Sequence, residues 1–387
     1  MSSLSGLKVL DLTTHLSGPY CTMILADHGA DIVKIERPDG GDPLRHSPPF
    51  QEGESAPFML WNRNKRSVVL NLKNQDDLAI VKKMAEKADV LVENFKPGTV
   101  KRLGLGYDLI SPKNPGLIYC SISGFGQTGP YALRGGFDLI ANAMSGLMSI
   151  NGPADGAPFR IPVPVSDLCA GMNAAMGILL ALVERQNSGV GQYVDTSLFE
   201  AGLSLGVYEA AGVFANGEVP KRLGQAHRGS APYQMFQTSD GYITVGAAQE
   251  NFWIALCKLL GCEHLLNDTR YQTKKDRVEH HVTLFDELSP YFKKHSTDEM
   301  WGLLDGAGIP AGPVLNHVEV LKNPQTIARD MVQHVKHPKL GVMKTLGAPV
   351  KLSKTPAEIS RAAPILGEHY SEVLKDWGIA KLDKPEV

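Results

Sequence analysis

The chain is poor in cysteine and carries no charge excess of either sign. Its five cysteines, spread over 387 residues, form no CxxC pair. An odd and scattered set is a poor disulfide framework, so we expect reduced thiols in a cytoplasmic compartment. Lys and Arg (39) nearly balance Asp and Glu (41), which gives a net charge of −2. Nothing in this balance indicates a nucleic-acid partner.

Export, membrane and metal signals are also lacking. The N-terminus has neither a basic region nor an apolar core of signal length. The longest apolar run, residues 176–183, is too short to cross a bilayer, so we expect no membrane partner. There is no HExxH motif, and the adjacent His280 and His281 would project from different sides of a helix. We therefore expect no metal.

The first 40 residues have the pattern of a βαβ unit. Residues 7–12 and 31–35 are predicted strands, and the helix between them ends near residue 28, which together favour a parallel sheet. The first turn offers only Gly18 and lacks the GxGxxG fingerprint, which argues against a nicotinamide enzyme. Arg37 follows the second strand, where ligands of such sheets gather, and is placed for a phosphate.

Two further groups after predicted strands are candidate ligand contacts. Basic residues 63, 65 and 66 precede the strand 67–72; such a cluster is usually solvated, but with Lys73 it can also clamp a polyphosphate. After strand 89–93, Phe95 either stacks on a base, with Asn94 at the base edge, or merely covers the strand end. The pattern decides neither between a solvated cluster and a phosphate clamp nor between a base-stacking and a covering role for Phe95.

The composition changes after residue 215. Residues 216–232 have no periodicity, and a second group of predicted strands and helices follows, including a capping box formed by Ser296 and Glu299. We therefore expect a large domain of residues 1–215, to which residues 330–387 return. Residues 216–329 would form a linker and a smaller α+β domain.

Residues 160–200 contain the carboxylate of greatest interest. A proline-stiffened run precedes a predicted helix rich in small residues, which indicates close approach of another backbone. Asp167 lies in the first turn of that helix, where free N–H groups and the helix dipole favour negative charge. Such a residue is usually a cap; the alternative is an ionised nucleophile.

Short motifs along nearly the whole chain resemble those of family III CoA-transferases, which include formyl-CoA transferase, carnitine CoA-transferase and α-methylacyl-CoA racemase. The motifs are residues 8–12, 30–38, 62–67, 92–95, 124–130, 167–171, 189–192, 240–242 and 366–369. The resemblance implies a Rossmann-like parallel sheet, a smaller α+β domain and an interlaced, ring-like homodimer. It also implies an enzyme that acts on CoA thioesters and small carboxylic acids.

The resemblance assigns roles to individual residues. The acyl-carrying aspartate of the family falls on Asp167. The expected CoA contacts are Leu16, Ser17, Arg37, Leu72, Lys73, Asn94, Phe95, Lys96 and Arg102. The expected substrate contacts are Gly126, Gln127, Phe137, His227, Arg228 and Gly229.

Departures from the family pattern narrow the chemistry. The racemase branch carries a histidine in a Gly-His-Asp motif, but here Phe137 takes its place, so two-base proton exchange lacks one base. The formyl-CoA branch carries four consecutive glycines where this chain has residues 227–230, HRGS. The stretch resembles the branch that uses succinyl-CoA and other dicarboxylates. His227 and Arg228 would then bind a second carboxylate; the alternative is that His227 is an ordinary loop residue.

The expected function is CoA transfer through an aspartyl–acyl anhydride and an aspartyl–CoA thioester, with backbone N–H groups near Gly126 or Gly229 stabilising the oxyanions. Two alternatives remain at this point. One is a 2-methylacyl-CoA racemase or epimerase, and the other is a CoA-binding scaffold without chemistry.

Overall fold

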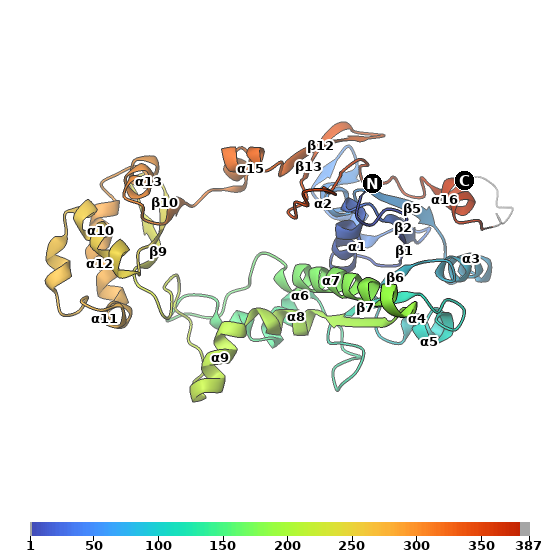
Figure 1. Ribbon diagram of the computed structural model, residues 1–387, viewed down its shortest axis with the longest axis horizontal. Helices are drawn as coiled ribbons and strands as arrows, with labels where there is room; N and C mark the ends of the chain where they lie inside the picture. The colour runs from blue at the N-terminus through green and yellow to red at the C-terminus, as the bar shows by residue number, and fades with distance from the viewer. Residues whose placement is uncertain (1, 380–387) are drawn as a thin grey trace. The chain divides into compact units, whose positions relative to one another are not determined.

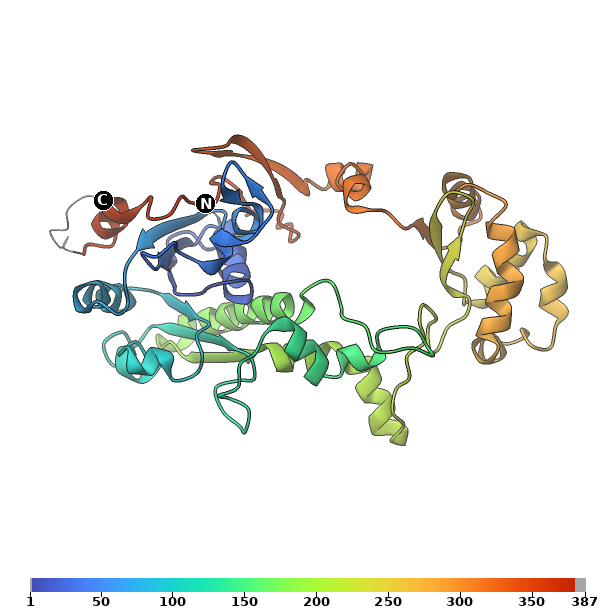
Figure 2. The ribbon, with the colours of Figure 1, turned by 180° about the vertical axis from the view of Figure 1, so that it is seen from behind.

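The computed structural model describes residues 2–379 and consists of two compact units. The large unit comprises residues 1–148, 160–217 and 324–387, and the small unit comprises residues 149–159 and 218–323. Figure 1 and Figure 2 show the chain from opposite sides. The division into domains of residues 1–215 with 330–387 and residues 216–329 stays a prediction, and its residues 1 and 380–387 lie outside the described part.

The large unit is built on a six-stranded sheet whose order is β5-β2-β1-β6-β7-β8. Every neighbouring pair in it is parallel, which confirms the predicted parallel sheet. Numbered along the sheet's own strands, this is the order 3-2-1-4-5-6 of dinucleotide-binding folds. The strands are β1 (Lys8–Asp11), β2 (Asp31–Glu36), β5 (Lys65–Val69), β6 (Val90–Glu93), β7 (Ile118–Ser123) and β8 (Tyr193–Ser197).

Helices cover both faces of this sheet (Figure 1). Short strands with apolar residues on both faces are typical of such a buried parallel sheet. One face carries α3 (Gln75–Ala85), α5 (Tyr107–Ile110) and α16 (Tyr370–Asp376). The other face carries α1 (Ser17–Asp27), α6 (Asp138–Met144), α7 (Val165–Ser188) and α8 (Leu198–Leu205).

Glycine lets α7 pack closely on α1. A Cβ at Gly171 would lie 2.6 Å from the carbonyl oxygen of Ser17, so only glycine fits this crossing. The expected close backbone approach is therefore confirmed, and its partner is α1 of the same chain. By length and hydropathy α7 would suffice for a membrane span, as would the bent pair of α8 with α9 (Val207–Asn216). Ala170, Ala174 and Ile178 of α7 nevertheless pack in the core, as in a core helix of an α/β unit.

The C-terminal part of the large unit packs on α2 (Ala56–Trp61) and on β5. An antiparallel pair, β12 (Val332–His337) and β13 (Gly341–Leu346), shares an apolar cluster with Phe58 and Met59 of α2. Arg66 ties α16 to β5 through Glu372 and Asp376, at 3.0 and 2.7 Å. The remaining short elements are η1 (Pro43–His46), β3 (Phe50–Gln51), β4 (Glu54–Ser55), α4 (Thr99–Arg102), η2 (Leu147–Ile150) and α15 (Pro324–Ala328).

The small unit has its own core between an antiparallel sheet and four helices. Phe236 stacks on Phe292 at 4.3 Å between ring centroids, and the Ser296–Glu299 capping box is confirmed. The strands are β9 (Tyr233–Gln237), β10 (Tyr242–Gly246) and β11 (Ala311–Pro313). The helices of this core are α10 (Glu250–Leu260), α11 (Lys274–Glu279), α12 (His281–Phe292) and α13 (Thr297–Gly306); η3 (Glu263–Asn267) and α14 (His317–Val320) complete the unit.

Two helical stretches are each divided in the structure. Residues 198–216 form α8 and α9, which meet at Gly206 and are bent by 67°. Residues 274–292 form α11 and α12, which meet at His280. A glycine accounts for the first break through its low helix propensity; for the break at His280 we have no physical account.

Candidate active site

The turn after β1 lies at the switch point of the sheet, where β1 and β6 are neighbours but their crossovers run in opposite directions. The side chain of Asn94, directly after β6, bonds both backbone groups of Thr14. The Thr14 N–H donates to Oδ1 at 2.9 Å, and Nδ2 donates to the Thr14 carbonyl at 2.8 Å. The amide of Asn94 thus joins the two strand ends, which was not expected from its predicted place at a base edge.

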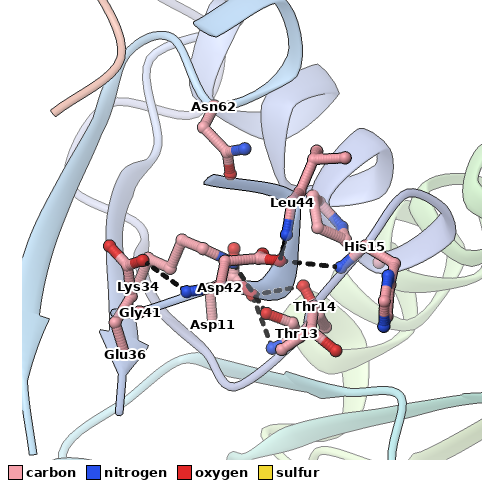
Figure 3. A network of polar contacts seen from close by, with 12 residues as sticks. Asp11, Thr13, Thr14, His15, Lys34, Glu36, Gly41, Asp42, Leu44 and Asn62 are labelled. Atoms are coloured by element: carbon pink, nitrogen blue, oxygen red, sulfur yellow. Dashed lines mark hydrogen bonds and ion pairs between the residues drawn. The ribbon is translucent and has the colours of Figure 1, made fainter. Parts of the chain in front are cut away.

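A buried ion network supports the same turn from the other side (Figure 3). Lys34 of β2 forms an ion pair of 2.8 Å with Asp42 and donates to the Thr13 carbonyl at 2.7 Å. Lys65 of β5 pairs with Asp11 of β1 at 3.2 Å. All four charged side chains are fully buried. Burial would raise the pKa of Asp11, but Lys65 and Lys34 beside it lower the value to about 2.

Asp167 lies in the first turn of α7, but it does not cap that helix. The N-cap position is Pro164, which makes no side-chain bond to the helix. Instead, Oδ1 of Asp138 accepts the N–H groups of Ser166 at 3.0 Å and of Asp167 at 3.4 Å. The cap therefore comes from the first residue of α6, and the usual interpretation of Asp167 as a cap is wrong.

The environment of Asp167 raises its pKa rather than holding it fully ionised. Burial is the main cause, and the nearby carboxylate of Asp138 adds to it; together they bring the pKa to about 7. A hydrogen bond from the Ser17 hydroxyl acts in the opposite direction. The expectation that the helix N-terminus would favour the charged form was wrong, because burial and the Asp138 carboxylate raise the pKa of Asp167 instead.

Several predicted CoA contacts meet in one cleft of about 550 Å³. It opens at the carboxyl ends of β1, β2 and β5, where Arg37, Leu72, Lys73 and Phe95 line it together with Thr13 and Thr14. Arg37 and Lys73 are exposed cations at its edge. Cations and an aromatic ring beside one opening can hold phosphates and a base.

Other predicted contacts lie outside this cleft. Leu16 is at the N-cap of α1. Lys96 and Arg102 are exposed, and Arg102 donates to the Thr99 hydroxyl at 3.1 Å. The structure therefore brings only some of the predicted CoA contacts together in this cleft.

The basic residues that precede β5 form no phosphate clamp. Arg63 is buried against Asp27 at 2.6 Å, and Lys65 belongs to the buried network. Arg66 is held by Asp31 at 2.7 Å as well as by the two carboxylates of α16. These cations are already neutralised, and they lie at or near the start of β5, away from the carboxyl edge where the cleft opens.

The glycine-rich turn after β7 approaches its own chain. A Cβ at Gly124 would lie 2.6 Å from the Cα of Gly136, directly before Phe137. The N–H of Gly126 donates to the Ser123 hydroxyl at 2.9 Å, so it is not free for an oxyanion. Among residues 2–379, Nε2 of Gln127 is buried without a hydrogen-bond partner. The role of Gln127 as a substrate contact stays a prediction.

Two motif matches lack the local structure that their motifs require. Residues 124–129 have the spacing GxGxxG, but the next helix, α6, begins only at Asp138. Residues 202–206 have the spacing GxSxG, but Ser204 lies within α8 and donates to the Ala201 carbonyl at 2.8 Å. Neither glycine-flanked segment forms the strand–turn–helix that its motif requires.

The predicted contacts of residues 227–229 lie in the small unit. His227 lines a cleft of about 680 Å³ beside β9, β10 and β11, with its ring 5.2 Å from that of Tyr233. Its Nδ1 accepts the N–H of Gly229 at 3.1 Å, so this second expected oxyanion donor is also engaged. The roles of His227 and Arg228 in substrate binding stay predictions.

Two carboxyl groups at the sheet edge were missed by the sequence analysis. Asp138 is separated from Asp167 by 29 positions, and no local pattern connects the two. Glu93, at the end of β6, accepts from the Ser121 hydroxyl and from the N–H of Phe95. Its burial raises its pKa to about 7. In sequence it is indistinguishable from a polar residue that ends a strand.

Comparisons with known proteins identify the family of the chain. Residues 4–370 match CoA-transferase family III. The chain is 39% identical over 374 residues to the succinyl-CoA:glutarate CoA-transferase of Homo sapiens, covering 96% of this chain and 85% of that protein. It is 38% identical over 389 residues to the succinyl-CoA:mesaconate CoA-transferase of Haloarcula marismortui, covering 98% and 97%.

A solved structure shows the same fold. The crystal structure of a CAIB/BAIF family protein from Brucella suis superposes with a TM-score of 0.88 at 34% identity, over 97% of this chain and 99% of that one. The resemblance inferred from the short motifs is confirmed. The chain belongs to CoA-transferase family III.

Proposed function

We propose that this protein transfers CoA from succinyl-CoA to a second carboxylic acid, with Asp167 as the nucleophile. The observation that carries the proposal is the placement of Asp167. Its carboxylate accepts a hydrogen bond from the Ser17 hydroxyl. Ser17 follows the turn whose Thr13 and Thr14 line the cleft together with Arg37. Relatives named for succinyl-CoA and glutarate or mesaconate support the choice of donor and of dicarboxylic acceptors.

The exchange proceeds in four steps at one carboxyl group. A carboxylate oxygen of Asp167 attacks the thioester carbonyl, and the CoA thiolate leaves, which forms a mixed anhydride. The thiolate attacks the aspartyl carbonyl and releases succinate. The acceptor carboxylate then displaces the thiolate to form a second anhydride. The thiolate finally attacks the acceptor's acyl carbon, which frees Asp167.

The groups around Asp167 suit these steps. Attack requires the carboxylate form, and a pKa of about 7 leaves a large ionised fraction near neutral pH while desolvation keeps the group reactive. Phe137 offers no base where a racemase needs one, which favours transfer over racemisation. No step requires a metal, and its absence stays a prediction.

We further propose an interlaced homodimer in the cytoplasm. Apolar side chains on α7 and α9 are exposed in the single chain, among them Leu180, Val207 and Phe214. Exposed large apolar side chains of this kind are typical of an interface. The cytoplasmic location rests on the thiol pattern described above.

The test uses Asp167→Ala and Asp167→Asn with succinyl-CoA and labelled glutarate. Both variants should lose exchange by at least about 10⁴-fold because the covalent path is removed, while CoA still binds. Hydroxylamine should trap the acyl group on Asp167 of the wild type only. Retained exchange in either variant would sink the assignment. A wild type that racemises 2-methylacyl-CoA but exchanges no acid would favour the alternative.

A further inference from the structure

His15 has a backbone conformation that residues other than glycine seldom adopt. Its φ is +64°, in the left-handed region. A residue with a Cβ persists there only where its surroundings hold it, and such positions cluster at functional sites. The conformation of His15 is therefore to be explained by the groups that surround the turn.

The surroundings hold the turn through its backbone on both sides. The N–H of His15 donates to Oδ1 of Asp42 at 3.2 Å, and its carbonyl accepts from the Trp61 indole at 3.2 Å. The preceding residue, Thr14, is bonded through both backbone groups to Asn94. The strained residue is thus fixed by side chains from three separate segments.

Buried charge anchors one side of this arrangement. Asp42 is held by Lys34, which also binds the carbonyl of Thr13 (Figure 3). A buried ion pair is a weak source of stability because desolvation offsets its attraction. Here the ion pair of Lys34 and Asp42 instead fixes the turn from residue 13 to residue 15.

The fixed turn presents the His15 ring toward Phe137, the residue before Asp138. In Figure 3 the ring points away from the ion pair of Lys34 and Asp42. It lies edge-on to Phe137, with 6.4 Å between ring centroids. The next residue, Asp138, bonds the backbone N–H of Asp167.

A second connection leads to the same carboxylate. Ser17, two positions after His15, donates its hydroxyl to Asp167. The His15 side chain is exposed, and within residues 2–379 neither ring nitrogen has a hydrogen-bond partner. The ring is therefore a donor that the fold leaves available, between Phe137 and the turn that leads to Ser17.

Resting on the proposed function, we propose that His15 binds the free carboxylate of a dicarboxylic acid whose other carboxyl group reacts at Asp167. An imidazole donates at least one N–H in either protonation state, and a carboxylate is a strong acceptor. His15 would then be a specificity-determining residue that favours dicarboxylic over monocarboxylic acids.

The experiment compares glutarate with butyrate as acceptors from one common donor, succinyl-CoA. His15→Gly and His15→Asn remove the imidazole, and both residues tolerate a positive φ, so the turn should persist. The ratio of kcat/KM for glutarate to that for butyrate should fall at least about tenfold in both variants. Glu52→Gly, at an exposed residue with φ +47° in the β3–β4 hairpin, controls for strain relief and should keep the ratio.

The outcomes separate the two proposals. A wild type that transfers CoA to no acid overturns the proposed function and the role of His15 with it. A wild type that transfers CoA while the His15 variants keep its glutarate-to-butyrate ratio overturns the role of His15 alone. Equal losses with both acceptors count as an unchanged ratio, because they show a role in shaping the turn only.

Discussion

The proton affinity of Asp167 is set by neighbours with opposing effects. Burial and the carboxylate of Asp138 raise its pKa, whereas the Ser17 hydroxyl lowers it. The same Asp138 caps α7 through two backbone N–H groups. One residue therefore both orients the proposed nucleophile and holds its pKa near neutrality.

Replacement of Asp138 by Asn should shift the pH profile. Asn keeps an oxygen for the backbone N–H groups but removes the negative charge, so the pKa of Asp167 should fall. Because only the carboxylate attacks, the acid limb of kcat/KM should move to lower pH by about 0.5–1 unit. Steady-state assays from pH 5 to 8.5 measure it. Asp108→Asn, an exposed carboxylate elsewhere in the unit, should leave the limb in place; an unmoved limb in Asp138→Asn contradicts this account.

At the scale of elements, the contact between α1 and α7 brings Ser17 to Asp167. Gly171 lies at this contact, and its missing side chain lets the carbonyl of Ser17 approach. Helix spacing and nucleophile geometry are thus linked through one glycine. The periodic small residues of α7 have this consequence because they face α1 rather than solvent.

Gly171→Ala should damage stability despite the better helix propensity of Ala. A Cβ 2.6 Å from a backbone oxygen forces the helices apart, at a cost of about 1–3 kcal/mol. The free energy of unfolding in urea measures this, and kcat should fall as well because Ser17 moves. Gly302→Ala in α13 meets nothing within 4 Å and should instead gain roughly 0.5–1 kcal/mol. If both variants behaved alike, close packing at Gly171 would not be the cause.

At the scale of the whole molecule, α7 has two apolar faces. Ala170, Ala174 and Ile178 pack against the sheet, while Met176, Leu180 and Val183 are exposed on another side. Phe214 of α9 is 87% exposed. An isolated chain would leave this surface to water, which is why we expect a partner copy to cover it.

Light scattering with size-exclusion chromatography tests this expectation. The wild type should elute as a dimer, and Leu180→Asp or Phe214→Asp should shift it toward monomer, because an interface cannot bury an unpaired charge cheaply. Val282→Asp replaces an apolar residue on α12 that is about as exposed as Leu180, and should leave the mass unchanged. A monomeric wild type, or dimeric variants with unaltered dissociation constants, would contradict the interface.

Sequence alone predicted the parallel sheet, the helix end near residue 28, and the family, because these depend on periodicity, on turn glycines and on short motifs. It also pointed to the group of Arg37, Lys73 and Phe95, since carboxyl ends of parallel strands share one edge. Local sterics and the geometry of the sheet carry this information, and both are readable along the chain.

Only the tertiary structure decided the partners of charged and polar groups. The basic residues before β5 are paired with distant carboxylates, and the amide of Asn94 holds a backbone turn. The raised pKa of Asp167 follows from burial and from Asp138, and the exposed ring of His15 follows from a turn fixed by three other segments. Such effects depend on distance and desolvation between residues far apart in sequence, which no local pattern records.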